Sequence, residues 1–223
     1  MHRPNSLRLP TPSPRCARSS TPTPVASPPS AASITDASAD VPWIAPMNGL
    51  TVLIGGARSG KSDLAVQIAQ RFSGPVSFIA TGQRIDDDMT ERIARHRAER
   101  PPWPTIEAPT DLTGALRSVA SDHLVIVDCL TLLVSNMMFA ERTDEHVGKE
   151  AAAAVAVACA RSAPTVVVTN EVGLGIHPDT ELGRRYRDLL GRVNRTWASA
   201  AQRSLFLVAG RAIALHDPWE FLS

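Results

Sequence analysis

One octapeptide constrains the fold of this chain more than any other feature, the sequence GGARSGKS at residues 55–62. It has the spacing G-x-x-x-x-G-K-[ST] and stands between an apolar run at 50–54 and a helical run at 62–72. Glycines let the backbone approach a phosphate without a Cβ clash, and amide N–H groups at the start of a helix face the anion. We therefore predict a phosphate-binding P-loop in which Lys61 reaches the β- and γ-phosphates and Ser62 binds Mg²⁺.

From residue 48 onward, short apolar runs alternate with helical segments, which predicts an α/β fold with a mostly parallel sheet. The apolar runs are continuous, as expected of strands that helices cover on both faces. With the P-loop, this order indicates a P-loop NTPase fold of RecA-like type. The predicted strands are 50–54, 76–80, 124–128, 165–169 and 205–208, and the predicted helices are 62–72, 86–99, 111–119, about 145–161 and one that begins near Pro178.

Residues 1–46 differ in composition, because they hold ten of the chain's 18 prolines among Ser, Thr and Ala. Such a segment cannot bury enough apolar surface to offset the entropy of ordering it. We predict a disordered Pro/Ser-rich leader at 1–46 and a single P-loop domain at 47–223. Two alternatives are a transit peptide, which the prolines disfavour by breaking its helix, and a translation start at Met47.

Composition argues against several classes of protein. Lys and Arg number 23 against 22 Asp and Glu, and aromatic residues make up 4%, so no nucleic-acid surface is expected. No apolar run approaches the roughly 18 residues of a membrane helix, and no signal segment opens the chain. The three cysteines lack metal-ligand spacing and are typical of thiols in a reducing compartment. We therefore expect a cytoplasmic protein.

Acidic and polar residues follow two of the predicted strands. Asp128 ends an apolar run as a Walker-B carboxylate does, which predicts a role in holding Mg²⁺; the alternative is a cap for the next helix. The segment TNEVG at 169–173 also ends a strand, where ligands gather in open α/β sheets. Its residues are equally consistent with a functional role and with a turn in which Glu171 caps a backbone amide.

The helix predicted at 86–99 opens with three aspartates, which complement the helix dipole. Along it Met89, Ile93 and His96 lie at i, i+4 and i+7, so His96 belongs to the inward face. Taken alone, this pattern favours a core histidine over a catalytic one.

Five segments together resemble a known family: 51–62 (TVLIGGARSGKS), 79–83 (IATGQ), 86–96 (DDDMTERIARH), 169–178 (TNEVGLGIHP) and 191–195 (GRVNR). Their order and spacing are similar to those of the bifunctional adenosylcobinamide kinase / adenosylcobinamide-phosphate guanylyltransferases of cobalamin biosynthesis. The resemblance implies phosphorylation of adenosylcobinamide by ATP or GTP, followed by transfer of GMP from GTP to adenosylcobinamide phosphate. It also implies a homo-oligomer, because relatives form trimers.

The resemblance implies roles for single residues as well. His96 would form a GMP–histidine phosphoramidate, Lys61 and Asp128 would complete the catalytic set, and Ser62 and Asp128 would bind the metal. Two positions depart from the family pattern. Relatives often have Glu where this chain has Asp128, and they can have a second His where this chain has Arg95. The implied nucleotide contacts are Gly55, Gly56, Ala57, Arg58, Ser59, Gly60, Lys61, Ser62, Ala80, Thr81, Gly82, Arg97, Ala98, Glu99, Arg100, Glu107 and Asp128.

Two other functions are consistent with the P-loop. A simple small-molecule kinase would need Lys61, Ser62 and Asp128 but would give His96 no role. A nucleotide-gated switch protein would bind GTP and transfer nothing.

Overall fold

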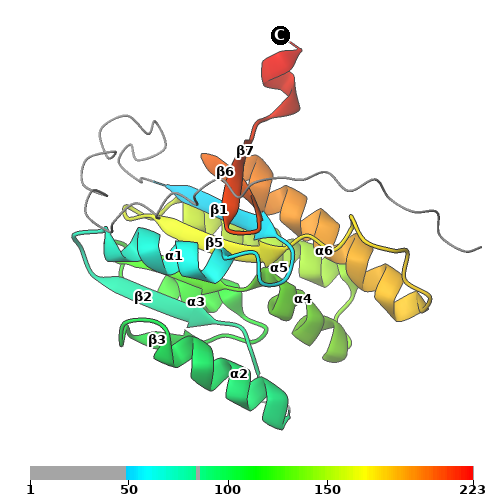
Figure 1. Ribbon diagram of the computed structural model, residues 1–223, viewed down its shortest axis with the longest axis horizontal. Helices are drawn as coiled ribbons and strands as arrows, with labels where there is room; N and C mark the ends of the chain where they lie inside the picture. The colour runs from blue at the N-terminus through cyan, green and yellow to red at the C-terminus, as the bar shows by residue number, and fades with distance from the viewer. Residues whose placement is uncertain (1–48, 84–85, 223) are drawn as a thin grey trace, which may run out of the picture. The chain divides into compact units, whose positions relative to one another are not determined.

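A computed structural model describes residues 49–83 and 86–222, so the leader predicted at 1–46 lies outside the described residues. A seven-stranded sheet runs through the centre in the order β3-β2-β4-β5-β1-β6-β7 (Figure 1). Every neighbouring pair is parallel except β6 and β7, which form an antiparallel hairpin. The strands are β1 (Leu50–Gly55), β2 (Val76–Ala80), β3 (Thr105–Glu107), β4 (Leu124–Asp128), β5 (Thr165–Asn170), β6 (Arg203–Val208) and β7 (Arg211–Leu215).

Helices cover both faces of this sheet. The helices are α1 (Lys61–Gln70), α2 (Asp87–Ala98), α3 (Leu112–Ser118), α4 (Leu130–Phe139), α5 (Asp144–Cys159) and α6 (Glu181–Ala200), followed by the 3₁₀ turn η2 (Pro218–Phe221). In β1, Leu53 packs with α1 on one face, while Val52 and Ile54 join a larger core with α3, α4, α5 and α6. Side chains of a strand alternate between faces, so a fully buried strand is apolar at every position. The predicted α/β fold, a mostly parallel sheet with helices on both faces, is confirmed.

Some elements differ from the sequence-based expectation. The five predicted strands and the first four predicted helices appear with ends shifted by at most two residues. The prediction that the last helix begins near Pro178 is wrong, because the hydroxyl of Thr180 accepts the N–H of Gly183 and starts α6 at Glu181. Strands β3 and β7 and helix α4 were not predicted. Within 49–83 and 86–222, no helix is both long and apolar enough to cross a membrane.

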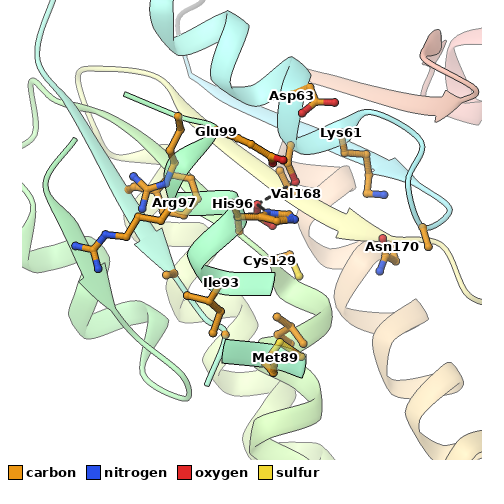
Figure 2. A pocket seen from close by; sticks show the side chains of 18 of the residues that line it. Lys61, Asp63, Met89, Ile93, His96, Arg97, Glu99, Cys129, Val168 and Asn170 are labelled. Carbon is orange, nitrogen blue, oxygen red and sulfur yellow. Dashed lines mark hydrogen bonds and ion pairs between the residues drawn. The ribbon is translucent and has the colours of Figure 1, made fainter. Parts of the chain in front are cut away.

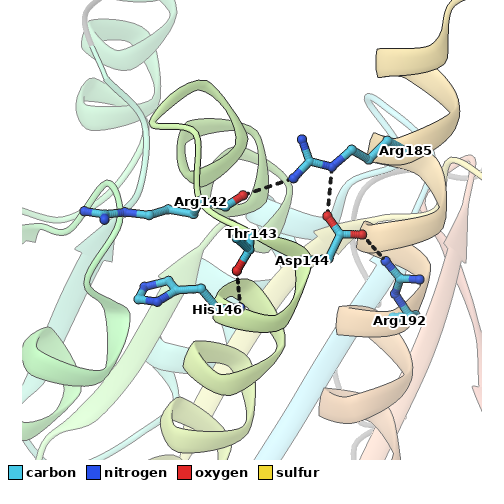
Figure 3. Close-up of polar contacts among 6 residues, drawn as sticks. All are labelled: Arg142, Thr143, Asp144, His146, Arg185 and Arg192. Carbon is cyan, nitrogen blue, oxygen red and sulfur yellow. Dashed lines mark hydrogen bonds and ion pairs between the residues drawn. The ribbon is translucent and has the colours of Figure 1, made fainter.

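A polar cluster fastens the start of α5 to α6 (Figure 3). Arg185 and Arg192 of α6 each bind one carboxylate oxygen of Asp144, at 2.8 Å and 2.6 Å. The hydrogen bond from Arg185 is the largest of the effects that lower the pKa of Asp144, and burial opposes it. Asp144 also lies in the first turn of α5, where a negative charge complements the helix dipole.

Strand register places the site. Gly55 at the end of β1 pairs with Asn170 at the end of β5, and Ala80 at the end of β2 pairs with Asp128 at the end of β4. The carboxyl ends of parallel strands meet at one edge of the sheet, where ligands bind in open α/β folds. The P-loop and Asp128 therefore lie at the same edge, with β5 between their strands.

Candidate nucleotide-binding and catalytic site

The P-loop follows β1 and has the backbone geometry of a phosphate cradle. A Cβ atom on Gly55 would lie 2.3 Å from the carbonyl oxygen of Leu207, so only glycine fits there. Gly60 caps α1 with φ of 92°, in the left-handed region that glycine adopts without strain. Lys61 Nζ donates to the Gly56 carbonyl at 2.6 Å and to Ser59 Oγ at 3.3 Å. Lys61 as a whole residue is 6% exposed. Its ammonium group therefore lies over the loop that would receive an anion.

Asp128 lies opposite the first turn of α1. Ser62 Oγ donates to Asp128 Oδ2 at 3.0 Å, so a hydroxyl and a carboxylate from the two predicted metal-binding positions meet. The helix-cap alternative does not hold, because the N-cap of α4 is Cys129 and has no side-chain cap bond. No cluster of three or more His, Cys, Asp or Glu side chains that could hold a metal occurs in the described part of the chain.

His96 lies on the cleft-facing side of α2 (Figure 2). The helix begins at an Asp86 side chain that accepts the N–H of Met89 at 2.7 Å. His96 Nδ1 is 4.0 Å from Asp128 Oδ2, and its side chain is 42% exposed against 15% for Asp128. The inward face of α2 therefore looks onto the cleft, and His96 is not a core residue.

A cleft of about 850 Å³ joins these groups. Its wall beyond His96 includes Arg97 from the last turn of α2, Glu99 and Arg100 just after that helix, and Glu107 from β3. The guanidinium of Arg100 lies 3.8 Å from the ring centre of Phe78, and its Nη2 donates to Thr105 Oγ1 at 2.9 Å. Burial and the nearby Arg97 lower the pKa of Arg100, while Asp128 opposes them; an arginine nevertheless stays charged at neutral pH.

Four of the implied nucleotide contacts do not line the cleft: Gly55, Gly56, Thr81 and Ala98. Thr81 is fully buried, and its hydroxyl donates to the carbonyl of Cys129 at 2.7 Å while it accepts the Cys129 N–H at 2.8 Å. Its backbone N–H also donates to the Asp128 carbonyl at 3.1 Å. The side chain of Thr81 therefore holds the strand end that carries Asp128.

Sequence reasoning missed several residues of the cleft wall. The N-terminal part of α2 and the start of α4 supply an apolar side (Figure 2). Asn170 at the end of β5 also lines the cleft, and it belongs to the TNEVG segment for which the sequence left a functional role open. Cys129 also lines the cleft, but burial, followed by the charge of Asp128, raises its pKa to about 11. A thiol in that state is protonated at neutral pH and is not a nucleophile. The turn interpretation of the TNEVG segment holds for Glu171, whose Oε1 accepts the N–H of Gly173.

Known proteins are similar to this chain over most of their own length. The chain is 40% identical over 168 residues to the bifunctional adenosylcobalamin biosynthesis protein CobP of Pseudomonas aeruginosa, covering 74% of this chain and 95% of that protein. It is 35% identical over 181 residues to the bifunctional adenosylcobalamin biosynthesis protein CobU of Escherichia coli, covering 74% and 99%. The CobU protein of Salmonella typhimurium is 36% identical over 180 residues, with 74% and 99% covered.

Solved structures with a related arrangement are more distant. A protein from Pyrococcus horikoshii OT3 has a TM-score of 0.49 and 7% identity, with 77% of this chain and 88% of that chain covered. The RadB recombinase has a TM-score of 0.42 and 18% identity, with 73% and 74% covered.

The family model for cobinamide kinase / cobinamide phosphate guanyltransferase matches residues 51–215. This range holds the P-loop, His96 and Asp128, so it includes every group that the cleft brings together. The resemblance drawn from the sequence motifs is confirmed, and the chain belongs to the cobinamide kinase / cobinamide phosphate guanyltransferase family of enzymes.

Proposed function

We propose that this protein phosphorylates adenosylcobinamide and then transfers GMP from GTP to the phosphorylated product through a GMP–histidine intermediate on His96. The observation that carries the proposal is the distance of 4.0 Å between His96 Nδ1 and Asp128 Oδ2, across a cleft that also contains the P-loop. A simple P-loop kinase needs no histidine there. The names of the relatives, which describe bifunctional proteins of adenosylcobalamin biosynthesis, support two activities on one chain.

The P-loop would bind the triphosphate of GTP or ATP. Backbone N–H groups between Gly56 and Ser62 donate to phosphate oxygens, and the N-terminus of α1 adds its positive partial charge. Lys61, which bonds the loop carbonyl of Gly56, would exchange that contact for phosphate oxygens when the anion arrives. Arg97 and Arg100 line the opposite wall and can steady further phosphate oxygens.

The residues present fit Mg²⁺. Ser62 Oγ and the Asp128 carboxylate are oxygen ligands of the kind Mg²⁺ takes, and Mg²⁺ normally completes its shell with substrate phosphates and water. Two protein ligands therefore suffice. When bound, the ion would neutralise charge on the phosphate oxygens.

His96 would act as the nucleophile of the guanylyl step. A ring nitrogen attacks the α-phosphorus of GTP, a P–N bond forms, and the bond to the α–β bridging oxygen breaks as pyrophosphate leaves. The carboxylate of Asp128 would stabilise the positive charge that the ring gains. In the second half, a phosphate oxygen of adenosylcobinamide phosphate attacks the same phosphorus, and the P–N bond breaks to restore His96.

Labelled GTP tests this proposal. The wild type should acquire α-label that is labile to acid and stable to base, and it should pass γ-label to adenosylcobinamide. His96→Ala should lose the α-label and keep part of the γ-transfer, because phosphorylation needs no imidazole. His146→Ala is the matched control, since His146 is an exposed residue of the first turn of α5 (Figure 3).

Two outcomes would contradict the proposal. Persistent α-label on folded His96→Ala would show that the nucleophile is a residue other than His96. Transfer of γ-label without any α-label on the wild type would favour the simple kinase. The homo-oligomer and the cytoplasmic location stay predictions, and sedimentation of the full chain would test the first.

A further inference from the structure

Asn170 lies between the two strands that carry the proposed chemistry. It ends β5, which pairs with the P-loop strand β1 on one side and with the Asp128 strand β4 on the other. Its direct register partner is Gly55, the first residue of the P-loop. Asn170 and Lys61 both line the cleft (Figure 2).

The backbone of Asn170 is held from two sides. Its N–H donates to Thr131 Oγ1 at 2.9 Å, and its carbonyl accepts Nδ2 of Asn194 at 3.0 Å. Asn194 is itself buried, and its Oδ1 accepts the hydroxyl of Thr169 at 2.7 Å. Because α4 and α6 supply these two anchors, the position of Asn170 is fixed before any ligand binds.

The side-chain amide of Asn170 makes no hydrogen bond with any residue of 49–83 or 86–222, unlike those of Asn136 and Asn194. Asn136 donates to two backbone carbonyls, and Asn194 bonds both Asn170 and Thr169. An amide offers two N–H donors and one acceptor. In Asn170 these groups face the cleft, where a bound molecule can take the place of water on them.

We propose that Asn170 is a catalytic residue of the kinase step, in which its amide N–H donates to an oxygen of the γ-phosphoryl group. The inference rests on the proposed function. In that step the hydroxyl oxygen of adenosylcobinamide bonds to the γ-phosphorus, the bond to the β–γ bridging oxygen breaks, and the hydroxyl proton is released to water. Charge spreads over the three equatorial oxygens of the γ-phosphoryl group in transit, so a fixed N–H donor there stabilises the transition state.

The guanylyl step places a different demand on the same residue. There the reacting phosphorus is α, and the γ-phosphate only departs within pyrophosphate. The loss of the Asn170 amide should therefore slow γ-transfer much more than formation of GMP–His96. A residue with a merely structural role would impair both reactions together.

Asn170→Ala and Asn170→Asp in the full chain test this proposal with GTP as the probe. Asn170→Ala should lower kcat for γ-transfer by about 10²-fold, the usual cost of removing one fixed donor to a developing anion. Self-labelling by α-labelled GTP, KM for GTP and the melting temperature should stay close to the wild type, because alanine retains both backbone anchors. Asn170→Asp should be slower still, since it keeps the shape of the side chain but turns a carboxylate toward the phosphate.

Asn194→Ala is the matched asparagine control. It removes the hydrogen bond from Asn194 to the Asn170 carbonyl. It should therefore lower the melting temperature, γ-transfer and α-labelling together. Asn170→Ala with γ-transfer near the wild-type rate, or with equal losses of γ-transfer and α-labelling, would overturn the role of Asn170. A wild type that transfers neither label would instead overturn the proposed function itself.

Discussion

Thr81→Val separates a structural role of the Thr81 hydroxyl from the nucleotide contact that the family resemblance implies. Valine keeps the shape of threonine but cannot make the two hydrogen bonds to Cys129, at 2.7 Å and 2.8 Å. The side chain is fully buried, so the Cys129 N–H and carbonyl would lose their partner.

The size of the effect follows from these two backbone groups. An unsatisfied buried donor or acceptor costs about 1–3 kcal/mol, and the lower half of this range applies because Cys129 borders the open cleft. Thr81→Val should therefore reduce the free energy of unfolding by about 2–4 kcal/mol. For a domain of this size that corresponds to a fall of about 4–16 °C in melting temperature.

The assay combines thermal unfolding with GTP binding on the same preparation, and Thr81→Ser is the control. Serine keeps the hydroxyl and loses only a methyl group, so it should cost about 1 kcal/mol and retain both activities. In Thr81→Val, γ-transfer and α-labelling should fall together with the melting temperature, because Asp128 is held through the same backbone. A Thr81→Val protein with the wild-type melting temperature and weak GTP binding would refute this reasoning and restore the direct nucleotide contact.

Three further predictions rest on single features. Lys61→Ala should slow γ-transfer and α-labelling by about 10²-fold or more, because both reactions place a triphosphate on one P-loop; unchanged α-labelling would show that GTP binds elsewhere. The folded-state pKa of Asp144 is lowered, so its ion pairs should stabilise the protein above the ordinary aspartate pKa and lose that effect as the pH falls through the folded value. Melting temperatures of the wild type and Asp144→Asn should therefore differ at pH 7 and converge in acid. A chain that begins at Met47 should fold and keep full guanylyl transfer, because the Pro/Ser-rich composition of 1–46 is unsuited to a core; loss of solubility or activity would contradict this.

The P-loop and Asp128 could be predicted from the sequence because their chemistry is local. A motif of fixed spacing can be recognised from its own residues, and so can a carboxylate at the end of an apolar run. His96 is different, since its helical periodicity indicates an inward face without distinguishing a core from a cleft. The family resemblance supplied that distinction, and the 42% exposure of His96 agrees with it.

Thr81 shows why the remaining site residues could not be predicted. Its hydroxyl is used by the junction between β4 and α4, and α4 itself was missed in the sequence. That helix is apolar on nearly all sides because it is buried between the sheet and α6, so it lacks the one-sided pattern that reveals a surface helix. Strand β7 was missed for the opposite reason, because all of its side chains are exposed and, among the described strands, it pairs only with β6.

The position of Asp128 has a consequence for how two reactions share one cleft. Its Oδ2 lies 3.0 Å from Ser62 Oγ and 4.0 Å from His96 Nδ1, so the same carboxylate faces the proposed metal-binding group and the proposed nucleophile. A guanylyl group on His96 would extend into the space beside the P-loop, where a second triphosphate would have to bind. If GMP on His96 fills that space, we expect that a single chain does not phosphorylate one substrate while it holds GMP for another. On the proposed mechanism, the nucleoside diphosphate from the first reaction would leave before GTP reacts with His96, and this would order the two steps.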